Sequence, residues 1–107
     1  MNNTGEPRIA LDMEKIKTFC EKWKIVEFSL FGSVLTDDFR PDSDVDVMVK
    51  FENPVMWSLK NLDKMEEELT AIIGRRVDLS TKLSVEYMPN YIRRKSILNG
   101  SRVFYAA

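Results

Sequence analysis

The sequence contains no histidine and only one cysteine, Cys20. Without histidine, the chain can form neither a Ser-His-Asp nor a Cys-His catalytic centre, and it has no histidine-ligated zinc site. A single cysteine also excludes an intrachain disulfide and a thiolate zinc cluster. Because Cys20 lies among apolar residues, we expect it to fill the core. Any acid–base chemistry must come from carboxylates, lysine or tyrosine.

Glycine, long apolar runs and excess positive charge are scarce as well. The four glycines, at positions 5, 32, 74 and 100, are too scattered for a GxGxxG or Walker-type phosphate loop. No apolar run is long enough to span a membrane, and the first residues lack the apolar core of a signal peptide, so we expect a cytoplasmic protein. With 16 basic against 17 acidic residues, the chain lacks the basic excess of a general nucleic-acid-binding protein.

The 107 residues predict a single domain over positions 1–107, in which 1–8 form a flexible polar tail. Apolar residues spaced by three and four predict helices, and alternating apolar residues predict strands. The predicted helices cover about 12–24, from the break at Asn53-Pro54 to 73, and 89–98; the predicted strands cover 25–31, 44–51, 75–80 and a short segment at 102–105. This alternation is typical of an α/β fold, with a small mixed β-sheet packed against helices.

Acidic residues at every second position, in DSDVDV at 42–47, are the most unusual feature of the chain. On a strand, Asp44 and Asp46 project from the same face, with Cα atoms about 6.5–7 Å apart. Such a pair can share a divalent cation or bracket two, and Mg²⁺ binds a few carboxylates together with water and phosphate oxygens. Asp78 is a third candidate ligand, because an acid within a short apolar strand is costly unless something compensates it.

Two other interpretations of the acidic run need to be compared with a metal site. The run could be an ordinary surface loop, which is the usual location of clustered charge. It could also be an EF-hand calcium loop, since Asp42, Asp44 and Asp46 match the first, third and fifth positions of that loop. Val47 stands where the EF-hand needs glycine, and Asn53 stands where it needs a bidentate glutamate. The EF-hand is therefore excluded, and the surface loop stays open.

Gly32 and Ser33 follow the predicted strand at 25–31 and could form an anion site. Glycine lets the backbone approach a ligand closely, and a helix N-terminus presents free N–H groups to an anion. A serine hydroxyl at such a turn can add a hydrogen bond to phosphate. Taken alone, a Gly-Ser pair is a weak signal, because the dipeptide is common in turns.

Taken together, FGSVLTDDFRPDSDVDVMVKF at 31–51 resembles the signature of the DNA-polymerase-β-like nucleotidyltransferases. That signature is hG[GS], a spacer, DhDh on a strand, and a third acid on a later strand. The chain is most similar to the minimal nucleotidyltransferases (MNT), often called MntA-like antitoxins, over nearly its whole length. The resemblance implies the polymerase-β-like fold, nucleotide binding by Gly32 and Ser33, and catalytic Mg²⁺ bound by Asp44 and Asp46. It implies that Asp78 helps to hold one metal and can deprotonate the attacking hydroxyl.

The chain departs from the family pattern just after the Gly-Ser pair. Many of these proteins read GSxARGE, so Thr36 and Asp37 stand where arginine and glycine are common. If the common arginine binds nucleotide phosphate, two alternatives stay open: nucleotide affinity is weaker in this chain, or Arg40 takes over that binding. The other basic clusters, Arg75-Arg76 and Arg93-Arg94-Lys95, are expected to be solvated helix ends or partner contacts.

The resemblance implies a transferase that uses two Mg²⁺ ions and moves AMP from ATP to a hydroxyl group. In the MNT branch the acceptor is commonly a tyrosine of a separate HEPN-domain ribonuclease toxin, which adenylylation silences. The leading hypothesis is therefore an antitoxin that forms a hetero-oligomer with a HEPN toxin. Two alternatives stay open: transfer to a small hydroxyl compound, as in the aminoglycoside-modifying relatives, and an antitoxin that acts by binding alone.

Overall fold

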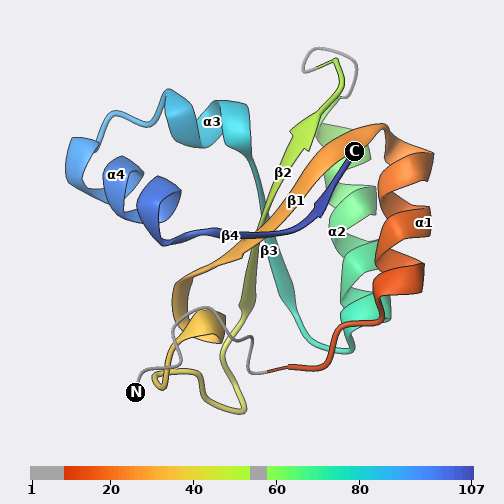
Figure 1. Ribbon diagram of the computed structural model, residues 1–107, viewed down its shortest axis with the longest axis horizontal. Coiled ribbons are helices and arrows are strands. Elements are labelled where there is room, and N and C mark those ends of the chain that lie inside the picture. Colours follow the sequence, from red (N-terminus) through yellow and green to blue (C-terminus); the bar gives the residue numbers. More distant parts are fainter. Residues whose placement is uncertain (1–8, 54–57) are drawn as a thin grey trace.

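The computed structural model describes residues 9–53 and 58–107 (Figure 1). Its elements, in chain order, are α1 (Met13–Trp23), β1 (Ile25–Phe31), the 3-10 turn η1 (Gly32–Leu35), β2 (Val45–Phe51), α2 (Leu59–Ile73), β3 (Val77–Thr81), α3 (Lys82–Glu86), α4 (Tyr91–Gly100) and β4 (Arg102–Ala106). The predicted flexible tail at 1–8 and the expected start of the second helix at 54–57 lie outside the described residues. Within the described ranges, no helix is long and apolar enough to cross a membrane.

The four strands form one mixed sheet in the order β3-β2-β1-β4. β1 pairs antiparallel with β2 and with β4, whereas β2 and β3 pair in parallel. A parallel pair needs a crossover connection, and α2 supplies it between β2 and β3. Helices α1 and α2 lie on one side of the sheet and α3 and α4 on the other (Figure 1). The predicted α/β fold with a small mixed sheet is confirmed.

Local caps account for the positions of the helix ends. The Asp12 carboxylate accepts a hydrogen bond from the Lys15 N–H at 3.3 Å and begins α1, as its position before the apolar pattern predicts. Ser58 and Asn61 form a reciprocal capping box at the start of α2. Gly74 ends α2 with a φ of 81°, in the left-handed region that glycine adopts easily.

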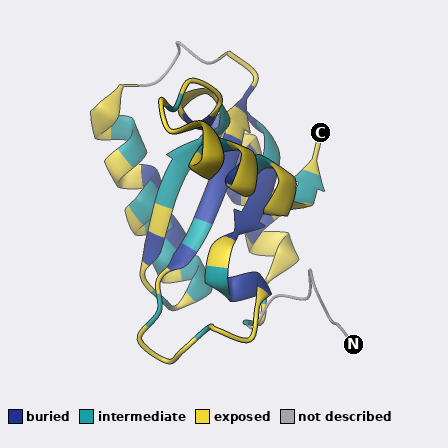
Figure 2. Ribbon diagram, turned by 90° about the vertical axis from the view of Figure 1, so that its left-hand side faces the viewer, coloured by how far each residue is buried: buried dark blue, intermediate teal, exposed yellow. Residues whose placement is uncertain are grey.

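The central strands β1 and β2 are largely buried, whereas β4 and parts of β3 are exposed or half-buried (Figure 2). Val45, Val47 and Val49 are fully buried beneath α1 and α2, so the apolar side of the acidic strand packs as its alternation predicts. A smaller apolar cluster on the opposite face holds α3 and α4 to the sheet; it consists of Phe31, Met48, Val85 and Ile97. Cys20 is fully buried in the main core, and burial raises the pKa of its thiol to about 12. The expected inert core cysteine is confirmed.

Helix α3 is the element that the periodicity did not predict. It is 5 residues long, which is too short to establish an amphipathic repeat. Its start is fixed by the Thr81 hydroxyl, which accepts a hydrogen bond from the Ser84 N–H at 3.1 Å. α3 contributes Val85 to the smaller cluster and leads the chain to α4, which forms one wall of the site described below.

Candidate active site

Two of the three candidate acids are brought together by the parallel pairing of β2 and β3. In that pairing Asp46 lies directly opposite Asp78. Adjacent strands are about 4.8 Å apart, and aligned residues project from the same face of a sheet. Asp44 lies just before the first residue of β2, Val45. Asp44 and Asp78 are exposed and Asp46 is half-buried, so the three carboxylates form an acidic edge that is open to solvent.

The charges of these acids affect one another. Burial raises the pKa of Asp46 above its ordinary value. The negative charges of Asp78 and Asp44 raise the pKa of Asp46 further. The positive charge of Arg93, on α4, acts in the opposite direction. The ionised cluster is therefore unfavourable by itself, and a bound cation would stabilise it.

Gly32 lies directly against the Asp46 carboxylate. Its neighbour Phe31 is paired with Asp46 across β1 and β2, and the chain turns into η1 at Gly32. Gly32 has a φ of 80°, which is unfavourable for any residue with a Cβ atom. A methyl group at this position would also overlap Oδ2 of Asp46. Glycine is thus favoured by the backbone conformation, and any Cβ atom here would also displace the Asp46 carboxylate.

The residues after Gly32 form a tight turn that presents a serine hydroxyl. The Ser33 carbonyl accepts hydrogen bonds from the N–H and the hydroxyl of Thr36, at 2.9 and 3.0 Å. Thr36 therefore closes the turn. The hydroxyl of Ser33 makes no hydrogen bond to any residue in 9–53 or 58–107, so it is available to a ligand.

A pocket of about 570 Å³ opens between this turn and α4. It is lined by Phe31, Gly32, Asp46, Asn90, Ile92, Arg93, Ser96 and Ile97. A second pocket, also of about 570 Å³, is lined by Gly32, Leu35, Thr36, Ser96, Asn99, Gly100, Ser101 and Arg102. Because Gly32 and Ser96 line both, the two pockets adjoin each other. Each has a volume that suits a small ligand such as a nucleotide.

The contribution of α4 to this site was not predicted. Asn90, Arg93 and Ser96 follow one another at a spacing of three, which gathers them on one side of the helix. The spacing predicts a polar face on this helix, but it does not predict that this face lies beside Gly32 and Asp46. Of the predicted residues, Gly32 and Asp46 line the first pocket, whereas Asp44, Asp78, Ser33 and Arg40 are not among its described lining residues.

Arg40 lies in the exposed loop between η1 and β2, and this loop is held by Arg75. The guanidinium of Arg75 donates hydrogen bonds to the carbonyls of Arg40 and Pro41, and to that of Ser43 at 3.3 Å. It also stacks 4.4 Å from the ring centroid of Phe39. Arg75 was expected to be a solvated helix end or a partner contact. Its side chain instead fixes the loop that leads into Asp44.

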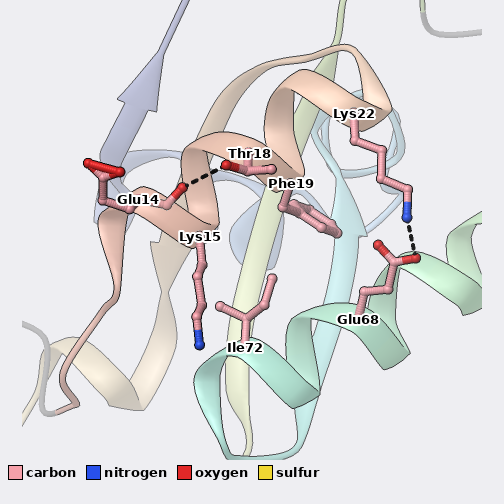
Figure 3. A pocket seen from close by; sticks show the side chains of 7 residues that line it. All are labelled: Glu14, Lys15, Thr18, Phe19, Lys22, Glu68 and Ile72. Atoms are coloured by element: carbon pink, nitrogen blue, oxygen red, sulfur yellow. Dashed lines mark hydrogen bonds and ion pairs between the residues drawn. The ribbon is translucent and has the colours of Figure 1, made fainter.

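A groove between α1 and α2 contains none of these acids (Figure 3). It has a volume of about 390 Å³ and is lined by Glu14, Lys15, Thr18, Phe19, Lys22, Glu68 and Ile72. Glu68 accepts hydrogen bonds from the Lys22 ammonium at 2.8 Å and from the Trp23 indole N–H at 2.9 Å. Burial would raise the pKa of Glu68, but these hydrogen bonds outweigh it and lower the pKa. We interpret these contacts as packing between the two helices.

The acidic edge suits Mg²⁺ better than a metal that needs a complete protein cage. No three carboxylate or thiol side chains in the described part of the chain converge closely enough to form a ready-made cage. Mg²⁺ does not require one, because it keeps several waters and is typically held by one or two carboxylates plus substrate phosphates. Asp44 and Asp46 can supply these carboxylates, and the mutual repulsion at Asp46 favours a cation there.

The mixed sheet, the glycine turn against a strand aspartate and the acid on the neighbouring strand are the features expected from the resemblance to nucleotidyltransferases. The sequence model of the family described as the nucleotidyltransferase domain matches residues 13–102. The chain belongs to this family of enzymes.

Individual relatives agree with this family. The chain is 39% identical over 70 residues to the protein adenylyltransferase MntA of Thermococcus cleftensis. The aligned region covers 65% of this chain and 69% of the relative. A toxin–antitoxin crystal structure with AMP-PNP has a TM-score of 0.69 at 16% identity, over 91% of this chain and 75% of that one. A complex of the tri-AMPylated Shewanella oneidensis HEPN toxin with the MNT antitoxin matches with a TM-score of 0.60 at 16% identity. This match covers 88% of this chain and 69% of the matched chain. At such identities the two structures establish the shared fold.

Proposed function

We propose that the protein is a Mg²⁺-dependent adenylyltransferase that moves AMP from ATP to a tyrosine of a HEPN-domain toxin and so acts as an antitoxin. The observation that carries the proposal is the register of β2 and β3, in which Asp46 lies opposite Asp78 while Gly32 lies against Asp46. The relative named a protein adenylyltransferase and the antitoxin seen with an AMPylated HEPN toxin support this choice of reaction and partner. A cytoplasmic location, where ATP is available, is part of the same proposal.

The residues of the site have distinct tasks in this reaction. Gly32 and Ser33 bind the triphosphate, and Asp44 and Asp46 hold Mg²⁺. When bound, Mg²⁺ offsets the negative charge of the phosphates and stabilises the attacking and leaving oxygens. The tyrosine oxygen attacks the α-phosphorus, the bond from this phosphorus to the oxygen bridging to the β-phosphate breaks, and pyrophosphate leaves. Asp78 accepts the proton of the tyrosine hydroxyl.

The openness of the acidic edge supports a protein acceptor. Asp44 and Asp78 are exposed, so a side chain that protrudes from another protein can reach them. A small acceptor would need walls on several sides to be held in place. Across the whole chain the charge is −1, which does not favour a long nucleic acid as the acceptor.

The proposal is tested by incubating this chain with α-labelled ATP, Mg²⁺ and a HEPN-domain protein. We expect label on the HEPN protein with the unmutated chain, and none with the double variant Asp44→Asn, Asp46→Asn. Asp42→Asn is the control for loss of a carboxylate outside the site, because it removes one negative charge from the adjacent exposed loop. Label transferred to aminoglycosides but not to the HEPN protein would contradict the proposal. So would inhibition of an unlabelled HEPN protein, which indicates an antitoxin that acts by binding alone.

A further inference from the structure

The pocket beside Asp46 has a single cationic side chain among its described lining residues, that of Arg93. The other side chains that line it are apolar, neutral or, for Asp46, negative. A nucleoside triphosphate carries several negative charges, so a site for it needs positive charge besides the metal. We propose that Arg93 of α4 binds the β- and γ-phosphates of the nucleotide. This assignment rests on the proposed function and adds a residue to it.

The guanidinium of Arg93 makes no hydrogen bond in the described part of the chain, unlike that of Arg94, although its charge acts on Asp46. Arg94 donates a hydrogen bond to the Met88 carbonyl at 3.1 Å and stacks 5.3 Å from the ring centroid of Tyr91. By contrast, the Arg93 side chain has no hydrogen bond or ion pair within residues 9–53 and 58–107. Its five N–H donors are therefore available, and a guanidinium binds phosphate oxygens in a bidentate manner.

The backbone of Arg93 is held firmly although its side chain is not. Its N–H donates a hydrogen bond to the side chain of Asn90, the N-cap of α4, at 3.0 Å. Ile97, one turn further along, is buried in the cluster that attaches α4 to the sheet. The base of the Arg93 side chain is thus fixed at the pocket wall, so a phosphate contact requires little reordering of the backbone.

Arg93 satisfies the requirement for which Arg40 was one alternative. Thr36, in the turn after Gly32 and Ser33, carries no charge, and its hydroxyl donates a hydrogen bond to the Ser33 carbonyl. Arg40 lies in the loop held by Arg75 and is not among the described residues that line the pocket. Arg93, on α4, lines the same pocket as Gly32.

Binding of ATP and AMP to four variants tests this assignment. Calorimetry with Mg²⁺ compares Arg93→Gln and Arg93→Lys with Arg40→Gln and with Lys95→Gln, the matched control from the exposed surface of the same helix. We expect Arg93→Gln to weaken ATP binding about 10- to 100-fold, the usual worth of a charge-assisted hydrogen bond. AMP binding should change by less than about twofold, because AMP lacks the β- and γ-phosphates. Arg93→Lys should retain part of the ATP affinity, and Lys95→Gln all of it.

The comparison of ATP with AMP separates phosphate binding from a purely structural role. If Arg93 only offset the charge of Asp46, Arg93→Gln would weaken ATP and AMP binding equally, which would overturn the assignment. Unchanged ATP binding by Arg93→Gln would overturn it as well, most clearly if Arg40→Gln lost that binding. A lack of ATP binding by the unmutated protein would instead overturn the proposed function and this assignment with it. Circular dichroism melts of each variant verify that the fold is retained.

Discussion

Replacing Gly32 with alanine tests the closeness of the glycine turn to Asp46, and Gly74 provides a matched control. The two glycines have nearly the same backbone conformation, with φ of 80° and 81°. A residue with a Cβ atom costs about 1–2 kcal/mol in this left-handed region. Alanine also restricts the unfolded chain, which offsets about 0.4–1 kcal/mol of that cost. We therefore expect each substitution to lower the free energy of unfolding by about 1 kcal/mol from backbone strain alone.

The two positions differ in what the new methyl group meets. At Gly74, apart from the adjacent residues and the backbone of α2 itself, no atom in residues 9–53 and 58–107 lies within 4 Å of the position that it would occupy. At Gly32 it would overlap Oδ2 of Asp46, so the carboxylate must move by about 1 Å, a displacement that can cost a catalytic group roughly 100-fold in rate. Gly74→Ala should therefore lower Tm by about 4–8 °C and keep its activity. Gly32→Ala should lower Tm at least as much and lose about 100-fold in AMP transfer.

Circular dichroism melts and initial rates of AMP transfer, measured at temperatures where both variants are fully folded, test this difference. Equal transfer rates for Gly32→Ala and Gly74→Ala would refute the inference that Asp46 needs the space left by Gly32. A loss of activity in both variants would show that strain, and not the position of the carboxylate, decides the rate.

For three further substitutions, the contacts predict whether stability or ATP affinity rises or falls. Asp46→Asn should raise Tm in Mg²⁺-free buffer at neutral pH, because the raised pKa of Asp46 means that its charge opposes folding. For the same reason the wild-type protein should gain stability as pH falls through the folded-state pKa of Asp46. Melts at several pH values should show this gain in the unmutated protein and not in Asp46→Asn. The charge of Glu68 has the opposite effect on stability, because its pKa is lowered in the folded state. The ionised Glu68 stabilises the fold above its unfolded-state pKa, and this stabilisation is lost as pH falls through its folded-state pKa. Glu68→Gln should accordingly cost about 0.5–1.5 kcal/mol at neutral pH in denaturant titrations, and an unchanged midpoint would contradict the importance of its bonds to Lys22 and Trp23. Ser33→Ala should weaken ATP binding by about 0.5–1.5 kcal/mol, or up to about 3 if the phosphate charge strengthens the bond, with catalysis retained at saturating ATP. A variant that is inactive even at saturating ATP would assign this hydroxyl a different role.

Features that depend on neighbouring residues in the sequence were predictable. The alternation around Asp44 and Asp46 indicated a strand with one acidic and one apolar face, and Val45 and Val47 are fully buried as expected. The end of α2 at Gly74 follows from the preference of glycine for the left-handed conformation that stops a helix.

Features that depend on how distant segments pack were not predictable from local patterns. The spacing within β2 and β3 does not specify that they pair in parallel with Asp46 opposite Asp78. The polar spacing on α4 does not specify that Arg93 lies beside the glycine turn, since α4 is attached to the sheet through the separate cluster around Ile97. Arg75 belongs to the same class, because its partners are carbonyls of a loop more than thirty residues earlier.

The central claim is that the acidic edge around Asp46 transfers AMP to a tyrosine of a HEPN toxin. Tandem mass spectrometry of a HEPN-domain protein, after incubation with ATP, Mg²⁺ and this chain, tests the claim most directly. We predict AMP on a tyrosine with the unmutated chain and with Asp42→Asn, and an unmodified toxin with Asp46→Asn. A toxin that stays unmodified in the presence of the unmutated chain, or that is modified equally by Asp46→Asn, would contradict the account.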